Sequence, residues 1–157
     1  MGLLDTLNDK KNEIKEQGDS VVETGQEKLE EAGEFKGALD GLDAIDEDTQ
    51  EIIDTATEGA QDVASENADM IQSNMEPVSE GLTEVSDEAN EAEEAEQGNA
   101  ENVSDAPGDY GSVASQAESG FEQLAEGFNE TSETAQEMND EFSSKADEMA
   151  SQLESIF

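Results

Sequence analysis

The chain has 157 residues, of which 44 are Asp or Glu and six are Lys, and its formal net charge is -38. Cys, His and Arg are absent, which excludes disulfides, thiol catalysis, Ser-His hydrolysis and arginine clamps on phosphate. Only 32% of the residues are hydrophobic and six are Phe or Tyr, so we expect narrow apolar stripes in place of a wide core.

The N-terminal segment, residues 1–36, carries five of the six lysines and is the mixed-charge part of the chain. We expect a helix over residues 3–32, in which Glu and Lys pair at spacings of three or four. Its apolar repeat is weak because charged and small residues interrupt it. The repeat positions are Leu7, Ile14 and Val21, and the intervening positions are Lys11, Gly18 and Gly25.

The acidic segment, residues 37–97, follows a soft boundary between Gly33 and Gly41 and is interrupted at Pro77. A proline ends a helix that reaches it from upstream but is favourable in the first turn of a new one, so we expect helices over 42–75 and 77–97. Asp48 and Glu51 are the expected capping pair of the first helix.

The two acidic helices differ in the quality of their apolar stripes. The stripe of the first is weakened by Gly59, Glu66 and Ser73, which fall on alternate core positions. Its apolar positions are Leu42, Ile45, Ile52, Ala56, Val63 and Met70. The stripe of the second has regular steps of four and three and shrinks towards alanine. It consists of Val78, Leu82, Val85, Ala89 and Ala92.

Residues 98–112 are predicted to be a flexible linker, because Pro107, Gly108 and Gly111 break any apolar period there. The long C-terminal amphipathic helix, residues 113–157, is the strongest structural prediction. Its apolar residues step by three and four from Ala114 to Phe142, and one extra step of four to Ala146 indicates a stutter. Ser115 and Glu118 offer a capping box at its start.

A helix of this length, about 65 Å at 1.5 Å per residue, needs a neighbour to cover its stripe. We therefore predict that the stripe is an interface, either between helices of one small bundle or with other chains. The predicted interface residues are Phe121, Leu124, Phe128, Met138, Phe142, Met149, Leu153, Ile156 and Phe157.

These patterns predict an all-α fold of long amphipathic helices. The expected arrangement is a hairpin or coiled-coil-like rod in which 42–97 pairs with 113–156 and turns at the linker. The longest apolar runs have only two or three residues, as at Ile52 and Ile53, so we expect no transmembrane segment.

Mutual repulsion of the carboxylates sets the conditions in which such helices are stable. Like charges three or four residues apart each oppose helix formation by roughly 0.2–0.5 kcal/mol. High salt, a basic partner, or disorder that ends on binding would each relieve this repulsion. The excess of acid and scarcity of Lys resemble halophilic proteins, and we expect a soluble protein located either on a virion-type particle or in the cytoplasm of a high-salt organism.

The acidic residues do not form a pattern that indicates a catalytic site, and we expect the protein not to be an enzyme. Paired acids need a walled pocket to raise one pKa, and the narrow stripes offer no such walls. The stretch from Asp40 to Glu51 has acids at both ends, as a calcium loop does, but Leu42 and Ile45 stand at its third and sixth positions, where a ligand and glycine are needed. We therefore expect no cofactor and no designed metal site, with only diffuse cation binding.

The preferred functional prediction is a non-enzymatic structural or assembly protein, a component of a larger virion-type particle or one adapted to high salt, that binds a protein partner or itself through its helical stripes. Direct binding of nucleic acid is not expected, since the chain repels phosphate. In charge and helicity the chain resembles phage DNA-mimic proteins, which implies a DNA-mimic inhibitor as one alternative. Residues 55–64 resemble late-embryogenesis-abundant repeats, which implies a stress-type disordered protein that folds on binding as another.

Overall fold

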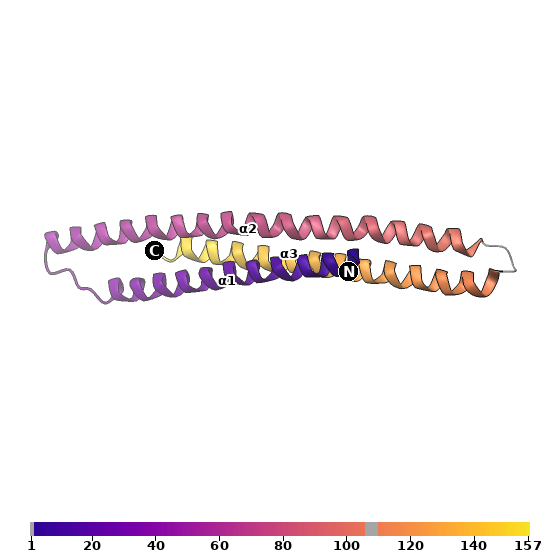
Figure 1. Ribbon diagram of the computed structural model, residues 1–157. Coiled ribbons are helices and arrows are strands. Elements are labelled where there is room, and N and C mark those ends of the chain that lie inside the picture. Colours follow the sequence, from indigo (N-terminus) through magenta and orange to yellow (C-terminus); the bar gives the residue numbers. More distant parts are fainter. Residues whose placement is uncertain (1, 106–109) are drawn as a thin grey trace. The chain divides into compact units, whose positions relative to one another are not determined.

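The structure, a computed structural model, describes residues 2–105 and 110–157 and is built from three α-helices. They are α1 (Leu3–Asp40), α2 (Glu47–Ser104) and α3 (Gly111–Ser155) (Figure 1). No strand occurs among the described residues. The all-α prediction is therefore confirmed.

The chain divides into two compact units, each of which contains a section of all three helices. Unit 1 comprises Met1–Lys15 and Glu80–Asp140, and unit 2 comprises Glu16–Ser79 and Glu141–Phe157. Each unit is stabilised by contacts between its own helix sections, so the two are described separately below.

The predicted end of the first helix near residue 32 is wrong, because α1 continues through Gly33 and Gly37 to Asp40. An interior glycine costs a helix only about 1 kcal/mol, and local contacts offset that cost. Lys36 pairs with Asp40 at 3.1 Å between Nζ and Oδ1. The ring of Phe35 lies 6.2 Å from that of Phe157, centroid to centroid, in an edge-to-face arrangement.

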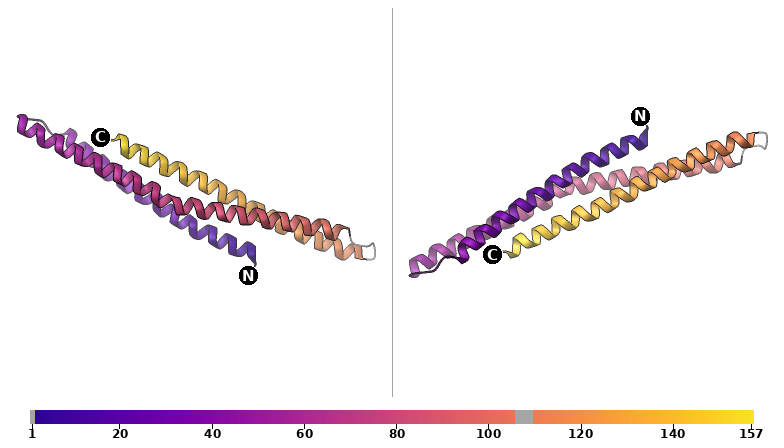
Figure 2. Two further views of the ribbon diagram at one scale, coloured as in Figure 1. Left: turned by 90° about the horizontal axis from the view of Figure 1, so that it is seen from above. Right: turned by 90° about the horizontal axis from the view of Figure 1, so that it is seen from below.

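The predicted interruption at Pro77 is also wrong, since α2 is continuous through it (Figure 2). Proline cannot donate the backbone hydrogen bond of its turn and costs a helix interior about 3 kcal/mol. Met75, Val78 and Leu82 are all buried on the same face of this part of α2. Burying each such side chain stabilises the fold by about 1.5–3 kcal/mol. Together these three contributions exceed the cost of the proline.

Helix covers both ends of the predicted linker, residues 98–112. Residues 98–104 belong to α2, with Ala100 buried, and α3 begins at Gly111. Ser115 is thus inside α3, and the predicted capping box there is wrong. Pro107 and Gly108 lie outside the described residues.

Asp46, rather than the predicted pair of Asp48 and Glu51, caps the start of α2. The backbone N–H and the hydroxyl of Thr49 both donate to Asp46 Oδ1 at 2.8 Å. These bonds have the geometry of an N-cap, in which a side-chain oxygen accepts from an amide that the helix leaves unpaired. The hydrogen bond from the Thr49 backbone lowers the pKa of Asp46, because it favours the charged carboxylate.

Replacing Asp46 with alanine is therefore expected to fray the first turn of α2, with faster hydrogen exchange at the Thr49 amide as the measure. Asp46→Asn keeps an oxygen acceptor and should retain most of the protection. Because the folded pKa lies below the unfolded value of about 3.9, the contribution of Asp46 is complete above that value and is lost as the pH falls through the folded pKa. Protection that is equal in the alanine and asparagine variants would contradict the cap.

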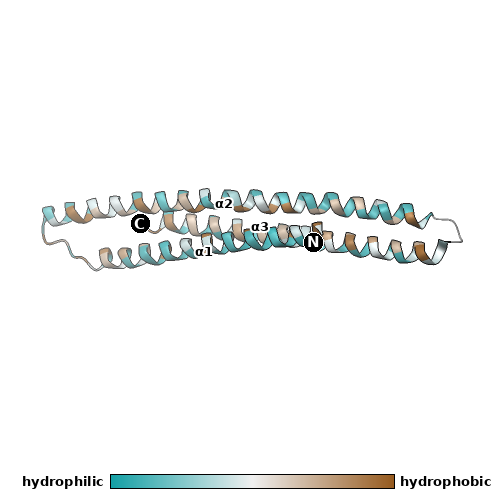
Figure 3. Cartoon of the chain, viewed as in Figure 1, coloured by the Kyte–Doolittle hydropathy of each residue, from teal (hydrophilic) through white to brown (hydrophobic). Residues whose placement is uncertain are grey.

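The cores of both units are narrow stripes between the helices. In unit 1, Leu7 of α1, Ala89 of α2 and Phe128 of α3 form one buried layer, against which Leu4 and Ala92 pack. In Figure 3 the hydrophobic colour occupies short stretches of each helix, and hydrophilic residues cover most of the ribbon. The predicted stripe from Val78 to Ala92 is confirmed, with its first four residues buried and Ala92 half-buried.

Candidate functional site: helix stripes and an open groove

The predicted interface residues of α3 fall into three groups by burial. Phe128, Phe142, Met149 and Leu153 are buried by this chain's own helices. Phe121, Met138, Ile156 and Phe157 are half-buried, whereas Leu124 is 42% exposed. The four buried residues are thus used in packing within the chain, and a surface for a partner must be sought outside them.

The buried face of α3 differs in register from the predicted stripe. Ala125 is buried in place of Leu124, and Ser132 is buried as fully as its neighbour Thr131. From Phe128 through Ser132, Ala135 and Phe142, the residues of this face follow one another in alternating steps of four and three. The same steps continue without interruption to Leu153. The predicted stutter is therefore not needed to explain the burial.

The first part of α2 also uses a different face from the predicted one. Ile52, Val63 and the preceding loop residues Leu42 and Ile45 are exposed, Ile45 to 89%. The buried residues of this stretch are offset by one or more positions and alternate in steps of four and three. They are Ala64, Ala68, Ile71 and Met75.

In unit 2, two glycines of α1 form sockets for large side chains of α3. A Cβ atom built on Gly18 would lie 2.7 Å from Cε2 of Phe142, and one on Gly25 would lie 2.5 Å from Cε of Met149. Both glycines are buried, so the backbone of α1 approaches α3 closely at these points. Gly18 and Gly25, which weaken the apolar repeat of α1, are therefore packing positions.

In unit 1, glycine sockets occur on α2 and α3. A Cβ atom on Gly81 would lie 2.8 Å from Cδ1 of Ile14, and one on Gly127 would lie 2.8 Å from Cδ2 of Leu4. These neighbours are the ends of flexible aliphatic side chains, whereas the neighbour of Gly18 is a flat aromatic ring. We therefore expect Gly18 to be the least tolerant of the sockets to substitution.

A buried polar layer joins α2 and α3 in unit 1. The hydroxyl oxygens of Ser86 and Ser132, both buried, lie 3.0 Å apart, and Gln136 Nε2 donates to Ser86 Oγ at 2.8 Å. On α1, Asn8 Oδ1 accepts a hydrogen bond of 3.0 Å from the Thr131 hydroxyl. Buried hydroxyls need such partners, so this layer favours one register of the helices over its neighbours.

We expect Ser132→Ala to lower the free energy of unfolding by about 1 kcal/mol, because it removes one partner from the buried Ser86 hydroxyl. Replacing both serines with alanine should restore much of the loss, since no unpaired hydroxyl then remains and the amide of Gln136, an exposed residue, can donate to water instead. Ser144→Ala on the exposed side of α3 is the control and should change the value by less than about 0.5 kcal/mol. Urea unfolding measures all three, and a double variant less stable than Ser132→Ala would contradict the hydroxyl pair.

An open apolar groove of about 460 Å³ lies in unit 2 between α1 and α2, beside the end of α3. Its walls include Ala32 and Phe35 of α1, Ala56, Ala60 and Val63 of α2, and the terminal Phe157. Phe35 and Val63 remain about half exposed within it. No groove of this kind was predicted from the sequence.

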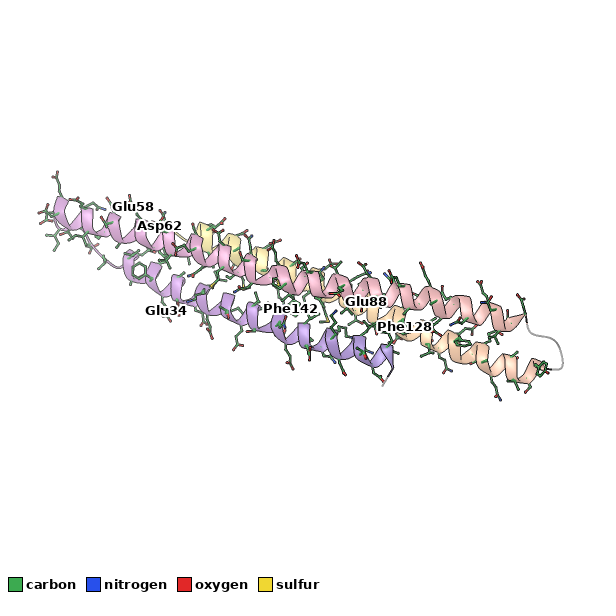
Figure 4. All side chains as sticks on the ribbon, turned by 45° about the horizontal axis from the view of Figure 1, so that its top comes forward. Glu34, Glu58, Asp62, Glu88, Phe128 and Phe142 are labelled. Carbon is green, nitrogen blue, oxygen red and sulfur yellow. The ribbon has the colours of Figure 1, made fainter. Side chains whose placement is uncertain are left out.

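A second hollow of unit 2, of about 620 Å³, lies between α2 and α3 and is polar. Asp69, Glu76 and Asp147 are among its lining residues. Across the described ranges, no group of three or more carboxylates is arranged to hold a metal ion. Figure 4 shows that the side chains of Glu58 and Asp62 project away from α2, whereas Phe142 lies between the helices.

Within residues 2–105 and 110–157, no helix is both long and apolar enough to cross a membrane. The chain matches no protein-family model, and no curated protein or solved structure is significantly similar to it.

Proposed function

We propose that this chain is a non-enzymatic structural protein that assembles with other proteins in a larger particle, of virion type, or that works in high salt. Its chemistry supports a scaffold: most of its ionisable groups are carboxylates on the outer faces of helices, and no His or Cys accompanies them. We further propose that α2 and α3 pair as a hairpin or coiled-coil-like structure. In unit 1, α2 Ser86 contacts α3 Ser132 while the earlier Thr83 contacts the later Asn139, the order that an antiparallel pair requires.

The observation that carries the proposal is the apolar groove of unit 2, in which the hydrophobic side chains of Phe35 and Val63 are about half exposed. Single exposed hydrophobic residues are ordinary on a protein surface, but exposed hydrophobic side chains that line an apolar groove are typical of an interaction site. The other exposed large hydrophobic residues of unit 2, Leu42, Ile45 and Ile52, lie in the loop after α1 and at the start of α2.

Rate-zonal sedimentation of an extract from the producing cells tests the assembly role. We expect the chain to sediment with a large particle and to be released from it by denaturant. A chain that stays at the top of the gradient at both low and molar salt would contradict the proposal.

A row of exposed carboxylates on α2 supports a DNA-mimic inhibitor as a second candidate. Acidic residues recur there every three or four positions, about one charge per 5 Å of helix, compared with one phosphate per about 3.4 Å on a DNA strand. In unit 1 the row consists of Glu80, Glu84, Asp87, Glu91 and Glu94, all exposed.

Competition with labelled duplex DNA for a basic DNA-binding protein tests this second candidate. A mimic should displace the DNA, and all titrations are made at one fixed ionic strength because salt weakens both complexes. Asp87→Asn combined with Glu91→Gln removes two charges from the row and should weaken the displacement. Absence of any displacement by the original chain would contradict the mimic.

A further inference from the structure

We propose that the apolar groove of unit 2 is a docking site for an amphipathic helix of a partner protein, apolar on one face and rich in Lys or Arg on its flanks. This inference rests on the proposed assembly role and names the surface and the kind of partner that would serve it.

The dimensions of the groove fit a short helix. Its α2 wall extends from Ala56 to Asn67, which is about 16 Å or three turns. The wall residues Ala56, Ala60, Val63 and Asn67 follow one another in steps of four, three and four, the spacing that receives the side chains of a packed helix. Small side chains on this wall allow a partner backbone to come close.

The groove continues the apolar stripe that α3 occupies in unit 2. Leu153 is the last fully buried residue of α3, and Phe157 lines the groove edge-on to Phe35. Beyond that point α1 and α2 still present apolar side chains, among them the half-exposed Phe35 and Val63. A helix in the groove would cover these residues as α3 covers their neighbours.

The negative charge of unit 2 favours a basic partner for the groove. Unit 2 contains 23 Asp or Glu and three Lys, and Lys28, which lines the groove, pairs with Glu31 at 3.6 Å. Glu27 and Glu66 are exposed beside the lining residues. A basic helix is attracted to this surface, whereas a second copy of this highly acidic chain is repelled.

The probe for the test is a labelled peptide of about fifteen residues, with Leu and Ala at three-four spacing and Lys elsewhere, titrated with the full chain. Its binding is followed by fluorescence anisotropy at about 0.15 M salt. Gly59 lines the groove, and a Cβ atom built on it meets nothing within 4 Å, so Gly59→Gln places a side chain in the groove. We expect it to weaken binding by about tenfold. Gly120→Gln, at an equally open helical glycine outside the groove, is the matched control and should change binding by less than about twofold.

A second matched pair removes apolar wall without adding bulk. Val63→Gln should weaken binding several-fold, and Val113→Gln, on an exposed valine of unit 1, should not. Circular dichroism verifies that all four variants keep the helicity of the original chain. Equal binding by all of them, or by a peptide with the same composition in shuffled order, would overturn the proposal in favour of diffuse ionic attraction.

Light scattering tests whether a second copy of this chain occupies the groove. A mass that doubles with concentration in the original chain but not in Gly59→Gln would assign the groove to a second copy and overturn the proposal. Failure of the peptide test would leave the sedimentation test of the assembly role unaffected. Conversely, groove-dependent capture of the peptide would stand even if the chain sedimented alone.

Discussion

Replacing Gly18 with alanine is expected to lower the free energy of unfolding by about 2 kcal/mol, although alanine is the better helix former by about 1 kcal/mol. The new Cβ would lie 2.7 to 2.9 Å from three ring carbons of Phe142. That ring is buried and flat, so it moves only by leaving a void or displacing its neighbours. Urea unfolding followed by circular dichroism measures the change.

Gly33→Ala provides the matched control for this prediction. Gly33 lies in the same helix, and a Cβ there meets nothing within 4 Å, so the substitution should raise the free energy of unfolding by about 0.5–1 kcal/mol. In a Phe142→Leu background the penalty of Gly18→Ala should shrink, because the ring carbons that oppose the new Cβ are gone. A Gly18→Ala variant as stable as Gly33→Ala would show that the two helices do not approach as described.

Raising the salt concentration from about 0.05 M to 1 M is expected to raise the free energy of unfolding by roughly 3–7 kcal/mol. About fifteen pairs of acidic residues stand three or four positions apart in α2 alone. Each such pair opposes the helix by about 0.2–0.5 kcal/mol at low ionic strength, and salt shortens the range of the repulsion from about 14 Å to about 3 Å.

The control for the salt prediction is a variant with fewer charges in one exposed row. Glu58→Gln combined with Asp62→Asn and Glu66→Gln removes three adjacent carboxylates without touching a buried side chain. This variant should be more stable than the original chain at low salt, and the difference should shrink at 1 M. Full stability of the original chain in nearly salt-free buffer, with no gain on adding salt, would contradict the role of repulsion.

The helices were predictable where large aliphatic side chains mark a stripe, as from Val78 to Val85. Prediction failed where a packing position is held by a residue that no apolar pattern counts. Gly18 is such a residue, because its importance comes from the ring of Phe142, which is far away in the sequence. Ser132 is another, since a serine becomes a core residue only when Ser86 supplies its hydrogen-bond partner.

Several helix ends that were predicted from local sequence signals differ from those in the structure. Pro77 interrupts a helix in isolation, but the buried residues on both sides of it outweigh the lost hydrogen bond. The groove of unit 2 had no counterpart in the sequence prediction, because Ala56, Ala60 and Val63 face it from one helix while Phe35 faces it from another. Only the pairing of α1 with α2 brings these residues together.

The bond between Asn8 and Thr131 has a consequence for the order of folding. It joins residues 123 positions apart, whereas the Ser86 and Ser132 hydroxyls are 46 apart. Closing the longer loop costs about 0.9 kcal/mol more chain entropy, so we expect α2 and α3 to meet before the N-terminal turns of α1 join them. Substitutions at Leu4 or Asn8 should then mainly accelerate unfolding and leave the refolding rate nearly unchanged.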